Sequence, residues 1–131
     1  MAAEIFRLHG SDKHVWLFDT FLGMTSPGPM DKRIMDGQSA YSEYERNMKS
    51  THNTWCFASW DDVRRNLLQR DLLSRSTLVK GDVVEVLRNQ SVALPTQISV
   101  LRLDTDWYDS TVAELEVLYP LISYAVFCLK K

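Results

Sequence analysis

The chain has 131 residues, of which 45% are hydrophobic and 24% charged, a composition typical of a folded domain rather than of a disordered segment. Fifteen Lys and Arg against seventeen Asp and Glu leave a formal net charge of -2, which excludes a global basic field that would attract nucleic acid or an anionic membrane. The length predicts a single domain over residues 1–131, and the longest apolar stretches fall far short of the roughly 20 residues that cross a bilayer.

The N-terminal region and the cysteines predict the compartment. Residues 1–10 mix charged with apolar side chains and lack the apolar core and cleavage site of a secretory signal peptide. Cys56 and Cys128 are the two cysteines, and their surroundings match neither a disulfide framework nor a zinc site. We therefore expect a cytoplasmic protein with reduced thiols and with neither nucleic acid nor a membrane as partner.

The first half of the chain alternates apolar runs with turn signals. In chain order, the expected elements are a helix over 2–8, a buried strand over 14–18, a mobile loop over 21–36, a polar helix over 41–49 and a helix over 59–73. Gly10 predicts the end of the first helix, because glycine readily adopts the left-handed conformation found there. Ser59 with Asp62 three residues later resembles a capping box and predicts the start of the last helix. The aromatic cluster at 55–60 is typical either of a core or of a pocket lining.

The second half predicts further strands, each followed by a helix or by the chain end. Its expected elements are a strand over 77–79, a short helix over 83–88, a strand over 98–103, a helix that ends before Pro120 and a strand over 121–129. Thr111 with Glu114 predicts a second capping box, and Asp109 is expected to cap the same helix. This alternation predicts an α/β fold, with a Rossmann-like parallel sheet and flanking helices.

Acidic residues follow three of the predicted strands. These residues are Asp19, Asp82 and the pair Asp104 and Asp106. In an open parallel sheet, ligands bind outside the carboxyl ends of the strands, so these acids mark the candidate site. An acid after the second strand of a nucleotide-binding half accepts hydrogen bonds from ribose hydroxyls, a role that suits Asp19. On spacing alone, Asp19 serves equally well as the cap of a turn.

Asp104 and Asp106 form a DxD pair whose chemistry the spacing leaves open. In an extended strand their side chains would point the same way, and two neighbouring carboxylates repel each other. Either Mg²⁺ between them or a raised pKa of one acid, suited to proton abstraction, would relieve that repulsion. A phosphohydrolase resembling the haloacid dehalogenase fold would carry Thr or Val two residues beyond the second acid, where this chain has Tyr108.

Four segments together resemble the macrocin O-methyltransferase family. They are VWLFDTFLGM (15–24), VKGD (79–82), LRLDTDWYDST (101–111) and LYP (118–120), and they stand in the order and spacing of the family over residues 13–122. The family comprises class I enzymes that depend on S-adenosylmethionine, many of which methylate a sugar hydroxyl of a natural product with help from Mg²⁺. The resemblance therefore implies an O-methyltransferase whose partner is a small-molecule hydroxyl acceptor.

The resemblance also implies a role for each acid. Asp19 would hold the ribose of S-adenosylmethionine, and Gly81 with Asp82 would lie beside its adenine. Asp104 is similar to a metal ligand of the family, and Asp106 to the general base that takes the proton of the acceptor hydroxyl. Residues 22–58 would form a lid and an aromatic insert.

The chain departs from the family pattern at both ends. Nothing before Val15 resembles the first strand and its Gly-rich turn, and residues 123–129 replace the segment whose adjacent acids complete the metal site. The resemblance thus implies an incomplete sheet, without the first strand and the C-terminal strands. The absent first strand would lie between the strands at 14–18 and 98–103, and these would have to close together, recruit another chain or stay partly molten.

Two hypotheses follow from that departure. The first is an O-methyltransferase that uses S-adenosylmethionine and an incomplete Mg²⁺ site, and that is impaired by truncation. The second is a non-catalytic remnant or interaction module of the same fold, which forms a homo-oligomer through its open strand edges.

Overall fold

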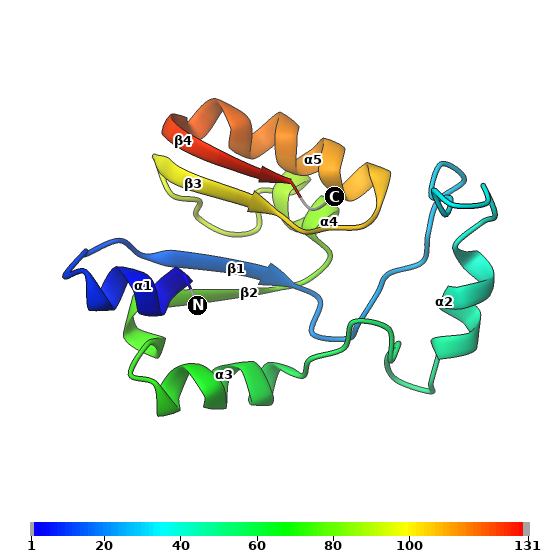
Figure 1. The fold of residues 1–131 in the computed structure, drawn as a ribbon, viewed down its shortest axis with the longest axis horizontal. Coiled ribbons are helices and arrows are strands. Elements are labelled where there is room, and N and C mark those ends of the chain that lie inside the picture. The colour runs from blue at the N-terminus through cyan, green and yellow to red at the C-terminus, as the bar shows by residue number, and fades with distance from the viewer. Residues whose placement is uncertain (1, 130–131) are drawn as a thin grey trace. The chain divides into compact units, whose positions relative to one another are not determined.

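The computed structural model describes the backbone of residues 2–129 and the side chains of residues 2–123. Its elements, in chain order, are α1 (Ala2–Leu8), β1 (Val15–Asp19), α2 (Tyr41–Asn47), α3 (Trp60–Gln69), η1 (Leu73–Arg75), β2 (Ser76–Lys80), α4 (Val83–Arg88), β3 (Ile98–Leu103), α5 (Tyr108–Leu118), η2 (Tyr119–Leu121) and β4 (Ile122–Leu129) (Figure 1). They form two compact units, which we call the first unit (residues 1–25 and 47–81) and the second unit (residues 26–46 and 82–131). The predicted α/β fold class is confirmed.

The first unit is built on the parallel pair β1 and β2, which lie side by side in Figure 1. Val15 stands opposite Ser76 and Asp19 opposite Lys80, so the carboxyl ends of the two strands coincide. A backbone hydrogen bond from Gly81 N to Asp19 O, 3.0 Å long, continues the pairing one residue further. The main chain therefore aligns the two loops that leave this end of the pair.

Helix ends in the first unit follow local capping chemistry. Gly10 has a φ of +64°, and the Ser11 amide donates to the Phe6 carbonyl at 2.8 Å, so the predicted end of α1 is confirmed. Ser59 Oγ accepts from the Asp62 amide at 3.2 Å, which confirms the predicted start of α3.

The predicted end of α3 at Leu73 is wrong, because the helix stops at Gln69. Asp71 adopts a φ of +55°, and the Leu72 amide turns back to the Leu67 carbonyl at 2.8 Å. An aspartate thus occupies the left-handed position that glycine usually fills, and buried Leu72 completes the turn.

The second unit pairs β3 with β4, again in parallel, and packs α4 and α5 against each other. Ile98 stands opposite Ile122 and Leu103 opposite Leu129, with a register irregularity between Ile98 and Val100. Its buried apolar side chains are Ala40, Val83, Val86, Leu87, Leu101, Leu103, Trp107, Ala113 and Leu118. This core is the larger of the two, because both helices contribute an apolar face to it.

Within the described residues, hydrogen bonds pair β1 with β2 and β3 with β4, and no ladder joins the two pairs. The expectation of parallel strands is therefore confirmed. Each of the four strands has one hydrogen-bonded neighbour.

The start of α5 differs from the prediction. The capping box at Thr111 and Glu114 is wrong, because α5 begins at Tyr108 and both residues lie inside it. Thr111 Oγ1 donates to the Trp107 carbonyl at 3.1 Å instead of accepting from a helix amide. Asp109, expected as a cap, lies in the first turn of the helix. The other strand and helix ends agree with the prediction to within one or two residues, the usual uncertainty of such boundaries.

Candidate functional site

The carboxyl ends of β1 and β2 bring Asp19 and Gly81 together through their main chains. Asp19 Oδ1 accepts a hydrogen bond from the Phe21 amide at 2.6 Å, so this residue does form the turn that its spacing allowed. Its side chain is exposed, and no hydrogen bond within the described residues uses Oδ2. Because an ionised carboxylate has about four acceptor positions, the turn leaves capacity for the hydroxyls of a ribose.

Gly81 suits the close approach of a ligand to the main chain. Its φ is +148°, a conformation that L side chains rarely adopt, so glycine is required by the backbone. The pattern VKGD thus combines a strand end, a glycine turn and a helix start.

Asp82, the next residue along the chain, caps α4 in the second unit. Its Oδ1 accepts from the Val84 amide at 2.8 Å. This bond satisfies one of the amides that a helix N-terminus leaves without an intrahelical partner. A structural role of Asp82 is therefore established, and its place beside an adenine stays a prediction.

Asp104 and Asp106 both follow the last residue of β3, and both are exposed. The strand ends at Leu103, so the expectation that the two side chains share one face of an extended strand does not apply. Asp104 Oδ2 forms an ion pair with Arg102 Nη2 at 2.7 Å. The described part of the chain contains no group of three or more His, Cys, Asp or Glu that could hold a metal ion. These residues alone therefore do not make the expected Mg²⁺ site.

Glu114 is a buried carboxyl that the sequence analysis assigned to a capping box. It is 7% exposed, and Thr105 Oγ1 donates to its Oε2 at 2.8 Å. Burial raises the pKa of Glu114 above 4.5, and the hydrogen bond from Thr105 opposes that rise. Thr105 stands between Asp104 and Asp106, so Glu114 is attached to the segment that carries the two acids.

Asp31 was missed by the sequence analysis. It is 8% exposed, and its carboxylate accepts two backbone hydrogen bonds, from Gly28 N to Oδ2 at 2.6 Å and from Tyr108 N to Oδ1 at 2.8 Å. Asp31 thus joins the loop at 26–40 to the first residue of α5. The turn-forming sequence around Gly28 could have suggested the bond from Gly28 N. No local sequence pattern predicts the bond from Tyr108 N, because Tyr108 is 77 residues away.

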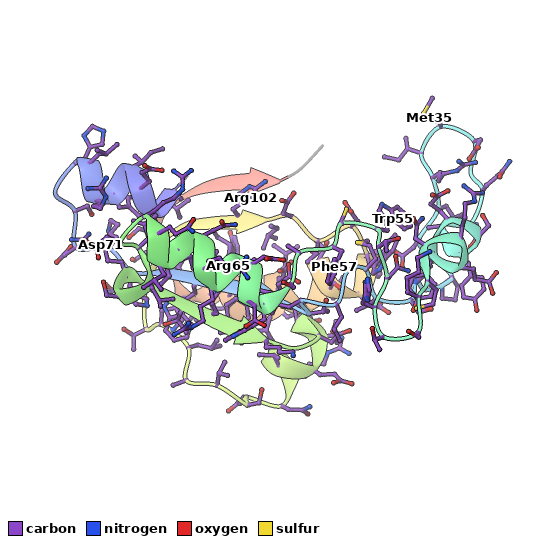
Figure 2. All side chains as sticks on the ribbon, turned by 90° about the horizontal axis from the view of Figure 1, so that it is seen from below. Met35, Trp55, Phe57, Arg65, Asp71 and Arg102 are labelled. Atoms are coloured by element: carbon purple, nitrogen blue, oxygen red, sulfur yellow. The ribbon has the colours of Figure 1, made fainter. Side chains whose placement is uncertain are left out.

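The aromatic cluster at 55–60 does not form one core, and its role as a pocket lining stays a prediction. Trp60 packs edge to face on buried Phe21, with ring centroids 4.9 Å apart. Phe57 is exposed and stacks on His52 at 4.4 Å. Figure 2, which shows all described side chains, labels Trp55 and Phe57 in this segment.

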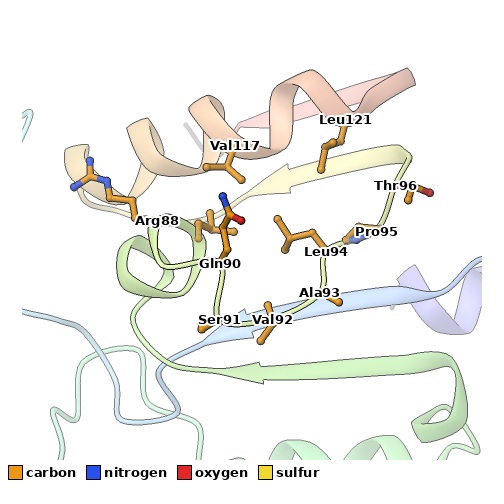
Figure 3. A pocket seen from close by; sticks show the side chains of 11 residues that line it. Arg88, Gln90, Ser91, Val92, Ala93, Leu94, Pro95, Thr96, Val117 and Leu121 are labelled. Carbon is orange, nitrogen blue, oxygen red and sulfur yellow. The ribbon is translucent and has the colours of Figure 1, made fainter.

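An open groove of about 690 Å³ lies in the second unit (Figure 3). Leu87, Arg88, Gln90, Ser91, Val92, Ala93, Leu94, Pro95, Thr96, Val117 and Leu121 line it. The loop at 90–96 leads into β3, and Leu121 directly precedes β4, so the groove belongs to the amino ends of these strands. The acids follow the carboxyl end of β3, and the groove is therefore separate from the candidate site.

Comparison with known proteins places these features in a family. The chain matches the family model of the macrocin-O-methyltransferases (TylF) over residues 1–130. It is 29% identical over 121 residues to demethyldecarbamoylnovobiocin O-methyltransferase from Streptomyces niveus, across 91% of this chain and 42% of that protein. The solved structure of the O-methyltransferase NovP matches with a TM-score of 0.70 and 29% identity, across 96% of this chain and 49% of that one.

The chain spans about half the length of these relatives, or somewhat less. In the described residues, no helix has the length and apolar character that crossing a membrane requires. The match over nearly the whole chain, the parallel strand pairs and the likeness to NovP agree with one another. The chain belongs to the macrocin-O-methyltransferase (TylF) family.

Proposed function

We propose that this chain carries the donor-binding turn and the acid-bearing segment of an O-methyltransferase that uses S-adenosylmethionine. The observation that carries the proposal is the pairing of Asp19 with Gly81 at the carboxyl ends of β1 and β2, in a chain that matches the family over residues 1–130. Ligands of open parallel sheets bind at this end of the strands.

The described residues fit the nucleoside part of that donor. Asp19 offers an exposed carboxylate whose Oδ2 is not engaged by the described residues, and this oxygen would accept hydrogen bonds from the ribose hydroxyls. Gly81 would leave room for the adenine because it has no side chain, and Asp82 would fix the adjoining backbone as the cap of α4. The donor role of each residue rests on the family pattern at its position.

Asp106 would accept the proton of the acceptor hydroxyl while the hydroxyl oxygen takes the methyl group. When bound, S-adenosylmethionine supplies a methyl carbon that is activated by its sulfonium sulfur. Asp106 is exposed in the segment that follows the carboxyl end of β3, and its assignment as the base rests on the family pattern at its position. The acceptor would be a hydroxyl of a sugar or another natural product. Asp104 would be one ligand of a magnesium ion whose further ligands the described residues do not supply.

Donor binding tests the proposal directly. S-adenosylmethionine is titrated by calorimetry into this chain and into a chain extended to the full length of the family. The variant Asp19→Asn keeps an oxygen that can accept from Phe21 N but loses the charge. Asp12→Asn, at the exposed residue before the opposite end of β1, is the matched control.

We expect Asp19→Asn to weaken donor binding by about tenfold or more, the loss of a hydrogen bond to a charged group, and Asp12→Asn to leave it unchanged. Equal binding by the two variants would contradict the role of Asp19. If the extended chain binds S-adenosylmethionine and this chain does not, the part of the fold that this chain does not span is required for donor affinity.

The unpaired strand edges favour a second candidate, a non-catalytic module that associates with itself. Each described strand pairs with one neighbour, and exposed edges are templates for pairing with another chain. Light scattering tests this alternative. Stable oligomers without donor binding would support it, whereas a monomer with cooperative unfolding would count against it.

A further inference from the structure

We propose that Asp31 is a positioning residue that couples the loop at 26–40 to the segment carrying Asp104 and Asp106. The functional role of this coupling rests on the proposed function. The attachment itself is argued from hydrogen bonds within the second unit. Asp31 makes this attachment as a substitute N-terminal cap for α5.

The start of α5 lacks a cap of the usual kind. Trp107 occupies the N-cap position, and its indole is a donor that cannot accept a bond from a helix amide. Asp31 Oδ1 accepts from the Tyr108 amide instead, at 2.8 Å. A carboxylate at a helix N-terminus is stabilised by the helix dipole and by the charge-assisted bond.

The other contacts of Asp31 hold the loop. Its Oδ2 accepts from Gly28 N at 2.6 Å, its own amide donates to Gly28 O at 3.1 Å, and its carbonyl accepts from Ala40 N at 3.2 Å. One buried residue therefore fixes both sides of the loop and the first residue of α5. The tip of the loop is held by local bonds of its own, such as those from Arg33 N to Gln38 O and from Gly37 N to Arg33 O, while its apolar side chains Ile34 and Met35 are almost fully exposed; Figure 2 labels Met35 at the tip.

The segment between β3 and α5 is attached a second time through Glu114. Thr105 Oγ1 donates to Glu114 Oε2 at 2.8 Å and lies 3.3 Å from Thr111 Oγ1. Asp104 and Asp106 flank Thr105, so one buried carboxyl holds the middle of the segment and another holds its end. Asp31 belongs to the loop, and a displacement of the loop would therefore release the end of the acid-bearing segment.

The variant Tyr108→Pro tests the attachment because it deletes the donor without opposing the helix. Proline is favoured at the first position of a helix, and Trp107 has φ -98° and ψ 144°, the extended conformation that a residue before proline adopts. Tyr108→Ala is the matched control, since it also removes the exposed phenol but keeps the amide. The measurement is hydrogen exchange of the Gly28 and Ala40 amides, without any ligand.

We expect these loop amides to exchange about tenfold or more faster in Tyr108→Pro than in Tyr108→Ala, as loss of a hydrogen bond to a charged group predicts. The amides of the last turns of α5 should stay protected in both variants. Equal exchange of the loop amides would overturn the proposal, because a cap that merely stabilises α5 would leave the loop unchanged.

Asp31→Asn provides the reciprocal test from the loop side. Its amide group can accept one of the two bonds but turns a nitrogen toward the other donor. Either the Tyr108 amide or the Gly28 amide should then exchange faster, according to which donor faces the nitrogen, whereas Asp36→Asn, at an exposed acid of the same loop that pairs with Arg33, should affect neither. Unchanged protection of both amides in Asp31→Asn would overturn the proposal.

A failure of S-adenosylmethionine binding in every chain, the unaltered one included, would contradict the proposed function and leave these exchange results standing.

Discussion

The two units hold their candidate residues by different means. In the first unit, the turn that carries Asp19 is held by backbone bonds and by the short side chains of Asp19 and Thr20, and the buried apolar side chains of the unit are few: Ala3, Phe21, Leu72 and Val79. In the second unit, the segment of Asp104 and Asp106 lies over a larger apolar core and is attached to two buried carboxyls, those of Asp31 and Glu114. The candidate turn of the first unit is thus held partly by its own short side chains, whereas the acid-bearing segment of the second unit is held by two buried carboxyls that lie outside it.

Together with the proposed function, this difference predicts that changes in the two units have different effects. Changes in the first unit should affect donor affinity, because its candidate residues would contact the nucleoside. Changes at Asp106 in the second unit should affect turnover, because this acid would act on the acceptor, whereas Asp82 of the same unit would belong with the donor residues. The following variants test this expectation from the largest expected effect to the smallest.

Asp106→Asn should separate turnover from donor binding most strongly. In a chain extended to the length of the family, we expect turnover to fall by about 10² to 10⁴, the usual contribution of a general base. Donor affinity measured by calorimetry should stay within about twofold, because the amide keeps the shape of the side chain. Glu116→Gln, at an exposed position of α5, is the control and should change neither quantity. A parallel loss of donor affinity would contradict this separation.

Gly23→Ala should destabilise the first unit by about 3 kcal/mol or more, since it combines overpacking with a left-handed backbone. A Cβ at Gly23 would stand 1.9 Å from the Asn53 carbonyl oxygen, and the residue has a φ of +79°. Gly10→Ala is the matched control, because its φ is +64° and a Cβ there meets nothing within 4 Å. We expect the control to cost about 1 kcal/mol. Urea unfolding measures the free energy of unfolding of both variants. Equal losses of stability would show that the backbone near Asn53 moves away to make room for the Cβ.

Glu114→Gln should change how the stability of the second unit depends on pH. Burial raises the folded-state pKa of Glu114 above 4.5, so its contribution to stability is fully present below about that pH and is lost as the pH rises through the raised value. Glutamine is neutral throughout and can still accept from Thr105. We therefore expect urea unfolding to show a smaller loss of stability toward neutral pH in the variant than in the unaltered chain. Identical pH profiles would contradict the buried state of the carboxyl.

Cap removal gives the smallest effect and compares the units directly. Asp82→Ala removes the side chain that accepts from Val84 N in the second unit, and Ser59→Ala removes the one that accepts from Asp62 N in the first. Each should cost about 1 kcal/mol of unfolding free energy. If Asp82 also contacts the donor, its variant should weaken S-adenosylmethionine binding as well, which Ser59→Ala should not do.

Local patterns predicted those parts of the fold that local chemistry determines. Gly10 ends α1 and Ser59 starts α3 because each acts on amides or carbonyls within a few residues. The strand at 98–103 was predicted with its exact bounds, since its apolar run ends abruptly at Asp104. The family resemblance was confirmed because its motifs keep their order over most of the chain.

The predicted helix ends were wrong where the expected local capping residues do not cap the helix. The sequence around α5 suggested a capping box at Thr111 and Glu114, but Asp31 caps the helix three residues earlier, and Glu114 instead binds Thr105. Asp71 ended α3 early in a conformation for which glycine is the usual signal. Contacts across 77 residues leave no periodicity or spacing in the sequence, so only the structure reveals them.

The most direct test of the central claim is an NMR titration of ¹⁵N-labelled chain with S-adenosylmethionine. The account predicts saturable shifts of the Phe21 and Gly81 amides, at the carboxyl ends of β1 and β2, with little change at Val15 and Ser76 at their amino ends. Saturable shifts confined to the amino ends, or to the groove that precedes β3, would contradict it.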